Sequence, residues 1–290
     1  MKLATGADIP DVAIGTYRLR GDDAERVVYD ALCVGYRHID TAAVYRNEVA
    51  VGRAIRRAID ENIMTRPELF VTTKVSPKHM GYAKTVEAIQ VSLRDLGLDY
   101  IDLMLLHWPG TQGKKADSPL QLPNRVGSMQ ALTEAFNAGT LKAVGVSNFL
   151  RAHFVGLDHF PIHVNQVEFH PLQWTAETHE LVGYCRRRHM VMAAYSSLGE
   201  GSLLDDVAYP ELAHVARQVG APATVAQVLL AWGHSHGWVV IPKASSKARI
   251  QENWDATRQV TLSEEHMTSI NAIVDRVGPV KFCWDPSVIA

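Results

Sequence analysis

The sequence predicts a closed (β/α)8 barrel, and three observations support this fold class. Eight short apolar runs, rich in β-branched residues, recur along the 290 residues. Longer segments with helical spacing separate most of them. The first run, VAIG, continues as TYRLR and lacks the G-x-G-x-x-G turn expected after the first strand of a doubly wound sheet. Because such a barrel typically takes about 250 residues, we expect one barrel domain over residues 1–290.

The expected strands are the apolar runs, because short runs of this composition between turn or helix signals are typical of strands. Their alternation with helical segments is the order that a barrel of parallel strands requires. The runs cover residues 12–15, 36–40, 69–74, 100–107, 141–147, 163–169, 190–196 and 238–243.

The clearest helices lie between the first four strands. The segment that starts at residue 23 places Val27, Ala31 and Val34 on one face, and Gly35 marks its end. Segments with this spacing are 23–35, 47–60 and 85–97. Residues 108–124, after the fourth strand, form the one long irregular stretch, and we expect it to be a functional loop.

Composition indicates a globular protein and gives no support to nucleic-acid binding, so we expect no nucleic-acid partner. Hydrophobic residues make up 47% of the chain and charged residues 21%. Lys plus Arg number 29 and Asp plus Glu 31, so the formal charge is −2, without a basic excess. Cys33, Cys185 and Cys283 show neither a disulfide framework nor zinc-ligand spacing. With no secretory leader and no membrane-spanning run, we expect a cytoplasmic protein without a membrane partner.

Polar residues stand at most of the expected strand ends, where the active site of such a barrel lies. A buried charge needs a partner, so this series indicates a site and not a simple core. The residues are Asp40, Lys74, His107, Ser147, Asn148, Asn165, Gln166, Tyr195, Ser196 and Lys243.

Asp40 and Lys74 end neighbouring strands, and we expect them to form an ion pair with Tyr45 close by. A free tyrosine is a weak acid, with a pKa near ~10. A neighbouring ammonium favours the phenolate, so we expect Lys74 to lower the pKa of Tyr45 while Asp40 orients Lys74. His107 adds a second polar contact. Such a group suits the protonation or deprotonation of an oxygen.

Each of these residues also has a structural interpretation when it is taken alone. Asp40 could cap a helix, Lys74 could be a surface lysine and His107 a buried structural histidine. A lyase could use Lys74 as an imine-forming amine, but an adjacent Asp40 would keep it charged. We expect no metal site, because HID is not an H-x-H pair and acidic ligands are few.

Six motifs resemble those of the aldo-keto reductase superfamily. They are GYRHIDTAAVYRNE, TTK, LLHWP, GVSNF, NQVEFHPL and IPKASSKARIQENW, and they occur in the family order. The resemblance implies a barrel that uses NADPH to reduce aldehydes or ketones to alcohols. It matches Asp40, Tyr45, Lys74 and His107 to the catalytic tetrad, with Tyr45 as proton donor and His107 orienting the carbonyl.

The resemblance also implies where NADPH or NADP+ binds. Ser147, Asn148 and Gln166 match residues that hold the nicotinamide carboxamide, and Tyr195 matches the platform that stacks on its ring. The cofactor-binding residues are then Gly15, Thr16, Asp40, Ser147, Asn148, Gln166, Tyr195, Ser196, Leu198, Lys243, Ser246, Arg249 and Asn253.

The last four residues of that set match the group that grips the 2′-phosphate and adenine, although Lys243 and Arg249 could also form a solvated basic face. Ala244 stands where many NADPH-dependent relatives carry serine. Charged hydrogen bonds are worth about 1.5–3 kcal/mol each, so two cations should outweigh one lost hydroxyl. We therefore expect an NADPH preference that is narrower than in relatives with the serine.

By resemblance, the substrate pocket is formed by Tyr17, Tyr45, His107, Trp108, the 108–124 loop and the tail KFCWDPSVIA. Many relatives have tryptophan in place of Tyr17. The short tail and a compact loop after the seventh strand predict an open pocket with broad carbonyl specificity. The resemblance also implies a monomer. The alternative is a relative that binds the cofactor without catalysis or serves a second role.

Overall fold

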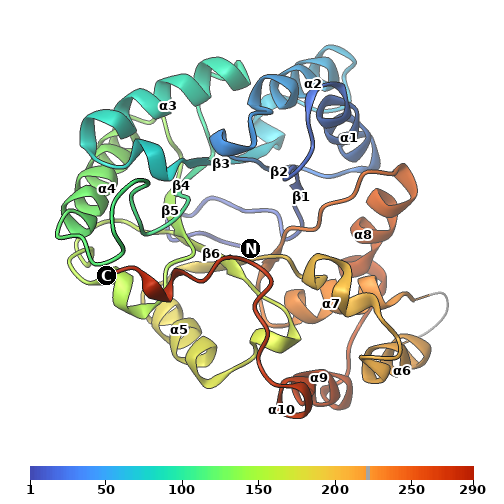
Figure 1. Ribbon diagram of the computed structural model, residues 1–290. Helices are drawn as coiled ribbons and strands as arrows, with labels where there is room; N and C mark the ends of the chain where they lie inside the picture. Colours follow the sequence, from blue (N-terminus) through green and yellow to red (C-terminus); the bar gives the residue numbers. More distant parts are fainter. Residues whose placement is uncertain (220–222) are drawn as a thin grey trace.

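Eight parallel strands form the centre of the computed structural model, which describes residues 1–219 and 223–290. Each strand pairs with the next one along the chain, from β1 to β8. Helices surround the strands in Figure 1. The strands are β1 (Ile14–Gly15), β2 (His38–Asp40), β3 (Phe70–Val75), β4 (Leu103–Leu106), β5 (Val144–Ser147), β6 (Val164–Glu168), β7 (Val191–Tyr195) and β8 (Val239–Val240).

Contacts between β8 and the segment before β1 close the sheet into a barrel. Val12 and Val240 form a parallel bridge. The backbone N–H of Val240 donates to the carbonyl of Asp11 at 2.9 Å, and the N–H of Ala13 donates to Val240 at 2.9 Å. Each strand overlaps the run in which it was expected, so the predicted barrel is confirmed.

Ten α-helices are found in the described residues. They are α1 (Gly21–Val34), α2 (Glu48–Asp60), α3 (Tyr82–Leu96), α4 (Gln121–Asn137), α5 (Ala176–Arg187), α6 (Pro210–Gln218), α7 (Val225–Ser235), α8 (Lys247–Gln259), α9 (Glu264–Asn271) and α10 (Ile273–Val277). In the part of the chain that is described, no helix has the length and apolar character needed to cross a bilayer.

The predicted helix ends are confirmed at two glycines. Gly35 follows α1 with φ 124°, and Gly97 follows α3 with φ 66°. Residues with a Cβ rarely adopt these conformations, so glycine lets the chain turn back toward the next strand.

The core has two layers because side chains alternate along each strand. In β4, Leu103 and Leu105 point into the barrel, and Met104 packs outward against the helices. Leu3 and Ile9 belong to the inner cluster, so the amino-terminal hairpin fills the end of the barrel opposite the strand ends. Below the polar side chains at the strand ends, the barrel interior therefore contains this apolar cluster.

Two segments differ from a regular barrel and from our expectation. The irregular stretch after β4 ends at residue 120 and not at 124, because α4 begins at Gln121. Pro123 is tolerated there, since the first turn of a helix lacks partners for its N–H groups. The crossover from β5 to β6 contains the 3-10 helix η4 (Arg151–Phe154) in place of an α-helix.

Candidate active site

The carboxyl ends of the strands open into a cavity of about 1430 Å³. It extends from Tyr17 and Trp108 to Arg249 on α8. Two predicted site residues, Lys74 and Ser246, do not belong to the cavity lining among the residues that the structure describes. The predicted site residues that line it are Gly15, Thr16, Tyr17, Asp40, Tyr45, His107, Trp108, Ser147, Asn148, Gln166, Tyr195, Ser196, Leu198, Lys243, Arg249 and Asn253.

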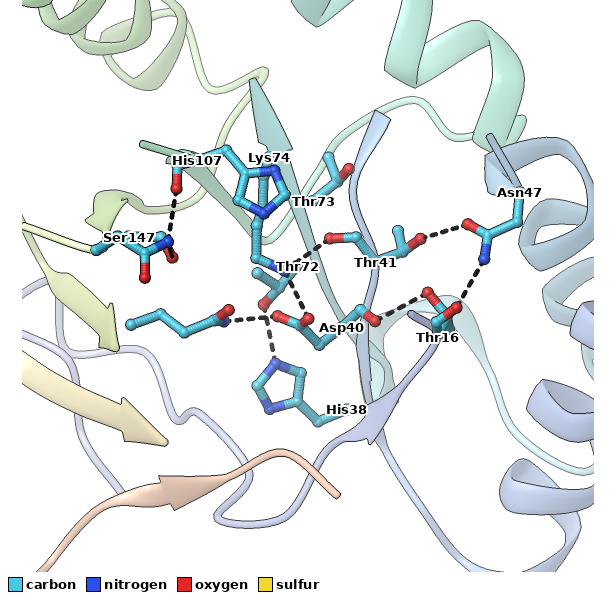
Figure 2. A network of polar contacts seen from close by, with 12 residues as sticks. Thr16, His38, Asp40, Thr41, Asn47, Thr72, Thr73, Lys74, His107 and Ser147 are labelled. Carbon is cyan, nitrogen blue, oxygen red and sulfur yellow. Dashed lines mark hydrogen bonds and ion pairs between the residues drawn. The ribbon is translucent and has the colours of Figure 1, made fainter. Parts of the chain in front are cut away.

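Asp40 and Lys74 form the expected ion pair, because β2 and β3 are adjacent in the barrel. Lys74 Nζ donates to Asp40 Oδ1 at 2.6 Å and to the carbonyl of Thr41 at 3.0 Å (Figure 2). Gln166 Nε2 donates to the second oxygen of Asp40 at 2.7 Å. Both charged side chains are buried, and burial lowers the pKa of Lys74 while the Asp40 charge opposes that shift.

Tyr45 ends the 3-10 helix η1 (Ala43–Tyr45), which follows β2. Its ring centroid lies 5.3 Å from Lys74 Nζ and 5.7 Å from the ring of His107. Burial raises the pKa of Tyr45 well above its usual value, and the charge of Asp40 adds to this effect. Our expectation of a lowered pKa was therefore wrong: the ammonium is already compensated by Asp40, so loss of hydration dominates.

His107 follows β4 and is a neutral imidazole. Burial lowers its pKa well below the usual value, and the charge of Lys74 lowers it further. Its Nδ1 is buried and has no partner among the described residues. A neutral imidazole carries one N–H, which can donate to an oxygen in the cavity.

An amide network lies beside this group. Asn148, which follows β5, donates from Nδ2 to the carbonyl of His107 at 2.9 Å and to Ser147 Oγ at 3.2 Å. Its Oδ1 accepts from the hydroxyl of Tyr195 at 2.6 Å. Gln166 uses its Nε2 on Asp40, so its Oε1 is available as an acceptor. This end of the cavity can therefore bind a planar amide, with Gln166 Oε1 and Asn148 Oδ1 as acceptors and the Ser147 hydroxyl as a donor.

Cationic side chains lie at the other end of the cavity, where α8 begins. Lys243 and Arg249 are exposed, and Asn253 is buried. Ser246 caps α8, and its hydroxyl oxygen accepts from the N–H of Arg249 at 3.5 Å. A helix N-terminus beside two cations favours an anionic ligand. Ala244 is buried in the apolar core, so this position offers no polar contact.

The turn after β7, whose GEGS segment (199–202) the resemblance matches to the region that closes over the pyrophosphate, adds one charged residue whose ion pair was not predicted. The helix η6 (Gly199–Leu204) contributes Glu200 to the cavity lining. Its carboxylate lies 3.5 Å from the guanidinium of Arg18, which belongs to the loop after β1. A pair between two loops leaves no pattern in the sequence that could have predicted it.

The carboxyl-terminal tail contributes part of the cavity wall, whereas the expected 108–124 loop contributes only Trp108 among the described residues. Phe282, Cys283 and Trp284 belong to the lining. Trp284 packs edge-on against Trp108, with ring centroids 4.9 Å apart. Tyr17 lies 5.2 Å from the ring of Tyr45, so aromatic rings border the reactive group on two sides.

A model of the aldo/keto reductase family matches residues 11–275. The chain belongs to this family. Two proteins of Bacillus subtilis are each 38% identical to it: the uncharacterised oxidoreductase YtbE, over 96% of this chain and 94% of its own, and glyoxal reductase, over 96% and 95%. Membership places the chain among oxidoreductases and confirms the resemblance drawn from the motifs.

Solved structures of the aldo/keto reductase family share the fold. An aldo-keto reductase from a Medee basin deep-sea metagenome library superposes with a TM-score of 0.85 at 37% identity, covering 98% of both chains. The Bombyx mori aldo-keto reductase in complex with NADP gives a TM-score of 0.80 at 34% identity, covering 94% of this chain and 92% of that one.

Proposed function

We propose that the protein is an NADPH-dependent aldo-keto reductase that converts aldehydes or ketones to alcohols. The observation that carries this proposal is the convergence of four residues at one end of the cavity. Lys74 Nζ lies 2.6 Å from Asp40 and 5.3 Å from the ring centroid of Tyr45, which is 5.7 Å from the ring of His107. Negative charge develops on a carbonyl oxygen during reduction, and this group offers donors to that oxygen.

Tyr45 is the proton donor in this proposal. NADPH, when bound, supplies the hydride that adds to the carbonyl carbon. The phenolic O–H of Tyr45 breaks as its proton moves to the carbonyl oxygen, and the O–H of the alcohol forms. Because burial raises the pKa of Tyr45, the phenol holds its proton throughout the neutral range until the oxygen becomes basic.

Lys74 and Asp40 support this transfer without contacting the carbonyl. The ammonium has three donors, of which Asp40 and Thr41 take two. Its third N–H has no partner among the described residues, and Nζ lies 5.3 Å from the ring centroid of Tyr45, so in this proposal that N–H turns toward the Tyr45 oxygen as negative charge develops there. The buried lysine lies behind the cavity lining and is paired, which also disfavours the imine mechanism.

His107 acts as a neutral hydrogen-bond donor to the carbonyl oxygen. The same burial that lowers its pKa removes imidazolium from the resting site, so His107 orients and polarises the carbonyl and leaves proton transfer to Tyr45.

The residues that hold NADPH are those expected from the motifs. The amides of Asn148 and Gln166, with Ser147, suit the nicotinamide carboxamide, and Tyr195 suits the ring face. Lys243 and Arg249 at the start of α8 suit the 2′-phosphate. The chemistry of this donor set fits the cofactor, because amide, aromatic and cationic groups follow one another along one cavity.

The substrate is a small carbonyl compound, and we propose a broad range. Half of the Tyr17 surface and 52% of the Trp284 surface are exposed, so the aromatic walls leave the reactive end open to solvent. One relative, 38% identical, is named glyoxal reductase. Glyoxal therefore belongs in any substrate panel.

Absorbance at 340 nm tests the proposal, with NADPH and a panel of glyoxal, small aldehydes, aromatic aldehydes and bulky ketones. Consumption of NADPH that depends on the carbonyl compound supports it. Binding of NADPH without turnover of any compound would refute it in favour of a non-enzymatic relative. Reduction of only one small compound would contradict the proposed broad substrate range, but not the reductase function itself.

A further inference from the structure

We propose that Glu168 is a positioning residue for substrate recognition, which fixes residues 281–284 as one wall of the cavity. The inference rests on the proposed reductase function. Glu168 ends β6 and does not belong to the cavity lining found among the described residues. It therefore acts through the chain segment that it holds.

Four donors surround the Glu168 carboxylate, whose side chain is 0% exposed. The backbone N–H of Phe282 donates to Oε1 at 2.6 Å, and that of Cys283 to Oε2 at 3.3 Å. Lys281 Nζ lies 3.0 Å from Oε2. His170 Nε2 lies 3.1 Å from Oε1. Three of the four donors come from the carboxyl-terminal segment, so this carboxylate joins β6 to the tail.

The charge state of this group suits an anchor. Burial alone would raise the pKa of Glu168, but the hydrogen bond from His170 and the charge of Lys281 outweigh it and lower the pKa to about 2. Burial lowers the pKa of His170, whose buried Nδ1 has no partner among the described residues. His170 is then the neutral Nε2–H tautomer, which donates to an ionised Glu168.

The loop after β6 provides the rest of the docking surface for this segment. Gln173 Nε2 donates to the carbonyl of Val280 at 2.7 Å, and the ring of His170 lies 5.0 Å from that of Phe282. Figure 1 shows the segment, in red, leaving α10 and crossing the mouth of the barrel toward α4.

A second anchor holds the far end of the segment. His153 Nε2 lies 3.1 Å from the carbonyl of Ile289, and the guanidinium of Arg125 donates to the carbonyl of Ala290. The chain between the two anchors carries Trp284, which contacts Trp108. Since the second anchor contacts only the last two residues, it leaves Phe282 and Cys283 to be held by Glu168, which binds both of their backbone N–H groups, and by the side-chain contacts of Phe282 with His170 and of Cys283 with Ser196.

The position of Glu168 explains why it can act on the wall and not on the chemistry. Gln166, two residues earlier on the same face of β6, contacts Asp40. Glu168 lies one layer further toward the mouth, paired in register with Tyr195. On one face of β6, Gln166 thus binds Asp40 of the tetrad, and Glu168 binds the segment that forms the substrate wall.

The test replaces Glu168 by Gln, which keeps the size and removes the charge. We expect hydrogen exchange of the amides of residues 281–284 to accelerate. KM for an aromatic aldehyde, 4-nitrobenzaldehyde, should rise about 10-fold, KM for glyoxal should change less than about 2-fold, and kcat should hold for both. Lys281→Met removes one of four donors and should give a smaller change in the same direction.

Glu211→Gln is the matched control. It removes a carboxylate that also binds the carboxyl-terminal part of the chain, through Arg276 at 2.7 Å on α10, and that does not belong to the cavity lining among the described residues. It should leave the amide exchange of residues 281–284 and both KM values unchanged. Thermal unfolding measures any general loss of stability in Glu168→Gln. Such a loss would affect the KM values for both aldehydes alike and would not produce a difference between them.

Two outcomes would overturn the proposal: unchanged amide exchange of residues 281–284 in Glu168→Gln, or equal changes in KM for both aldehydes. If the unmodified protein reduces no carbonyl compound, the reductase function fails, and the role of Glu168 in recognition fails with it. Accelerated exchange in that case would still identify Glu168 as the anchor of the segment, so the two failures are distinguishable.

Discussion

Tyr45 carries the proton in the proposed reaction, and its hydroxyl makes no hydrogen bond to another described residue. Tyr45→Phe removes only that hydroxyl, so we expect reduction to fall by about 10²–10⁴, as for loss of a general acid. Cofactor affinity and the free energy of unfolding should hardly change. Steady-state rates, together with quenching of tryptophan fluorescence by NADPH, check this. Near-normal turnover in the Phe variant would show that another group protonates the product.

Lys74 has a structural role as well as a catalytic one. Lys74→Met leaves the buried carboxylate of Asp40 without its cation, so we expect the free energy of unfolding to drop by about 3–5 kcal/mol, with activity nearly lost. The double variant Asp40→Asn/Lys74→Met removes both charges and should regain much of the stability but none of the activity. Urea unfolding and rates measure the two effects. Full activity of the single variant would contradict the role of the pair.

Single residues show both the reach and the limit of sequence reasoning. Asp40 and Lys74 were predicted to pair because each stands at the end of a buried run, and the barrel brings such ends together. The same signal stands at Glu168, a carboxylate at the end of the sixth run, but three of its four partners, Lys281, Phe282 and Cys283, lie more than a hundred positions later. The pKa of Tyr45 was missed because its burial depends on contacts from distant segments, such as Tyr17.

At the scale of elements, we expect the start of α8 to determine the choice between NADPH and NADH. Arg249 lies in its first turn, where the helix N-terminus and a guanidinium both favour phosphate. Arg249→Ala should weaken NADPH binding about 10–100-fold, as for the loss of a charged hydrogen bond, and leave NADH binding nearly unchanged. Fluorescence titrations with both cofactors check this.

The matched comparison for this element is Lys247→Ala. Lys247 is exposed in the same turn but does not belong to the cavity lining among the described residues. It should leave both affinities nearly unchanged. Equal affinity of the unmodified protein for NADPH and NADH would refute the predicted preference.

Elements with strong local signals were predicted well, and those defined by their neighbours were not. The helices α1 and α3 have apolar faces and are followed by glycine, so their carboxyl-terminal ends were predicted to within one residue. The start of α4 was missed because Pro123 suggests a loop, although proline is compatible with a first turn. The ion pair between Arg18 and Glu200 was not predicted, because it joins two loops that meet only in the closed barrel.

At the scale of the whole molecule, buried histidines make stability depend on pH. Burial lowers the pKa of His38 and that of His153 to about 4. In the unfolded chain these groups take up protons near ~6.5. Their contribution to stability is therefore fully present above pH ~6.5 and is lost as the pH falls toward 4, at up to ~1.4 kcal/mol per pH unit for each.

Urea unfolding at pH 7, 6 and 5 measures this dependence. His38→Gln should reduce the slope by about 1.4 kcal/mol per pH unit, because one proton fewer is taken up on unfolding. His214→Gln, on the exposed surface of α6, should leave the slope unchanged. An unchanged slope in His38→Gln would contradict the prediction.

The closure of the barrel has a consequence for how the protein is made. Val12 pairs with Val240. The outer edge of the first strand therefore has no partner strand until almost the whole chain has been synthesised. At ~5–20 residues per second, β8 leaves the ribosome more than about 10 s after β1. Until then the nascent sheet keeps open edges that can pair with other chains. Translation speed and chaperone supply should therefore affect the soluble yield of the protein.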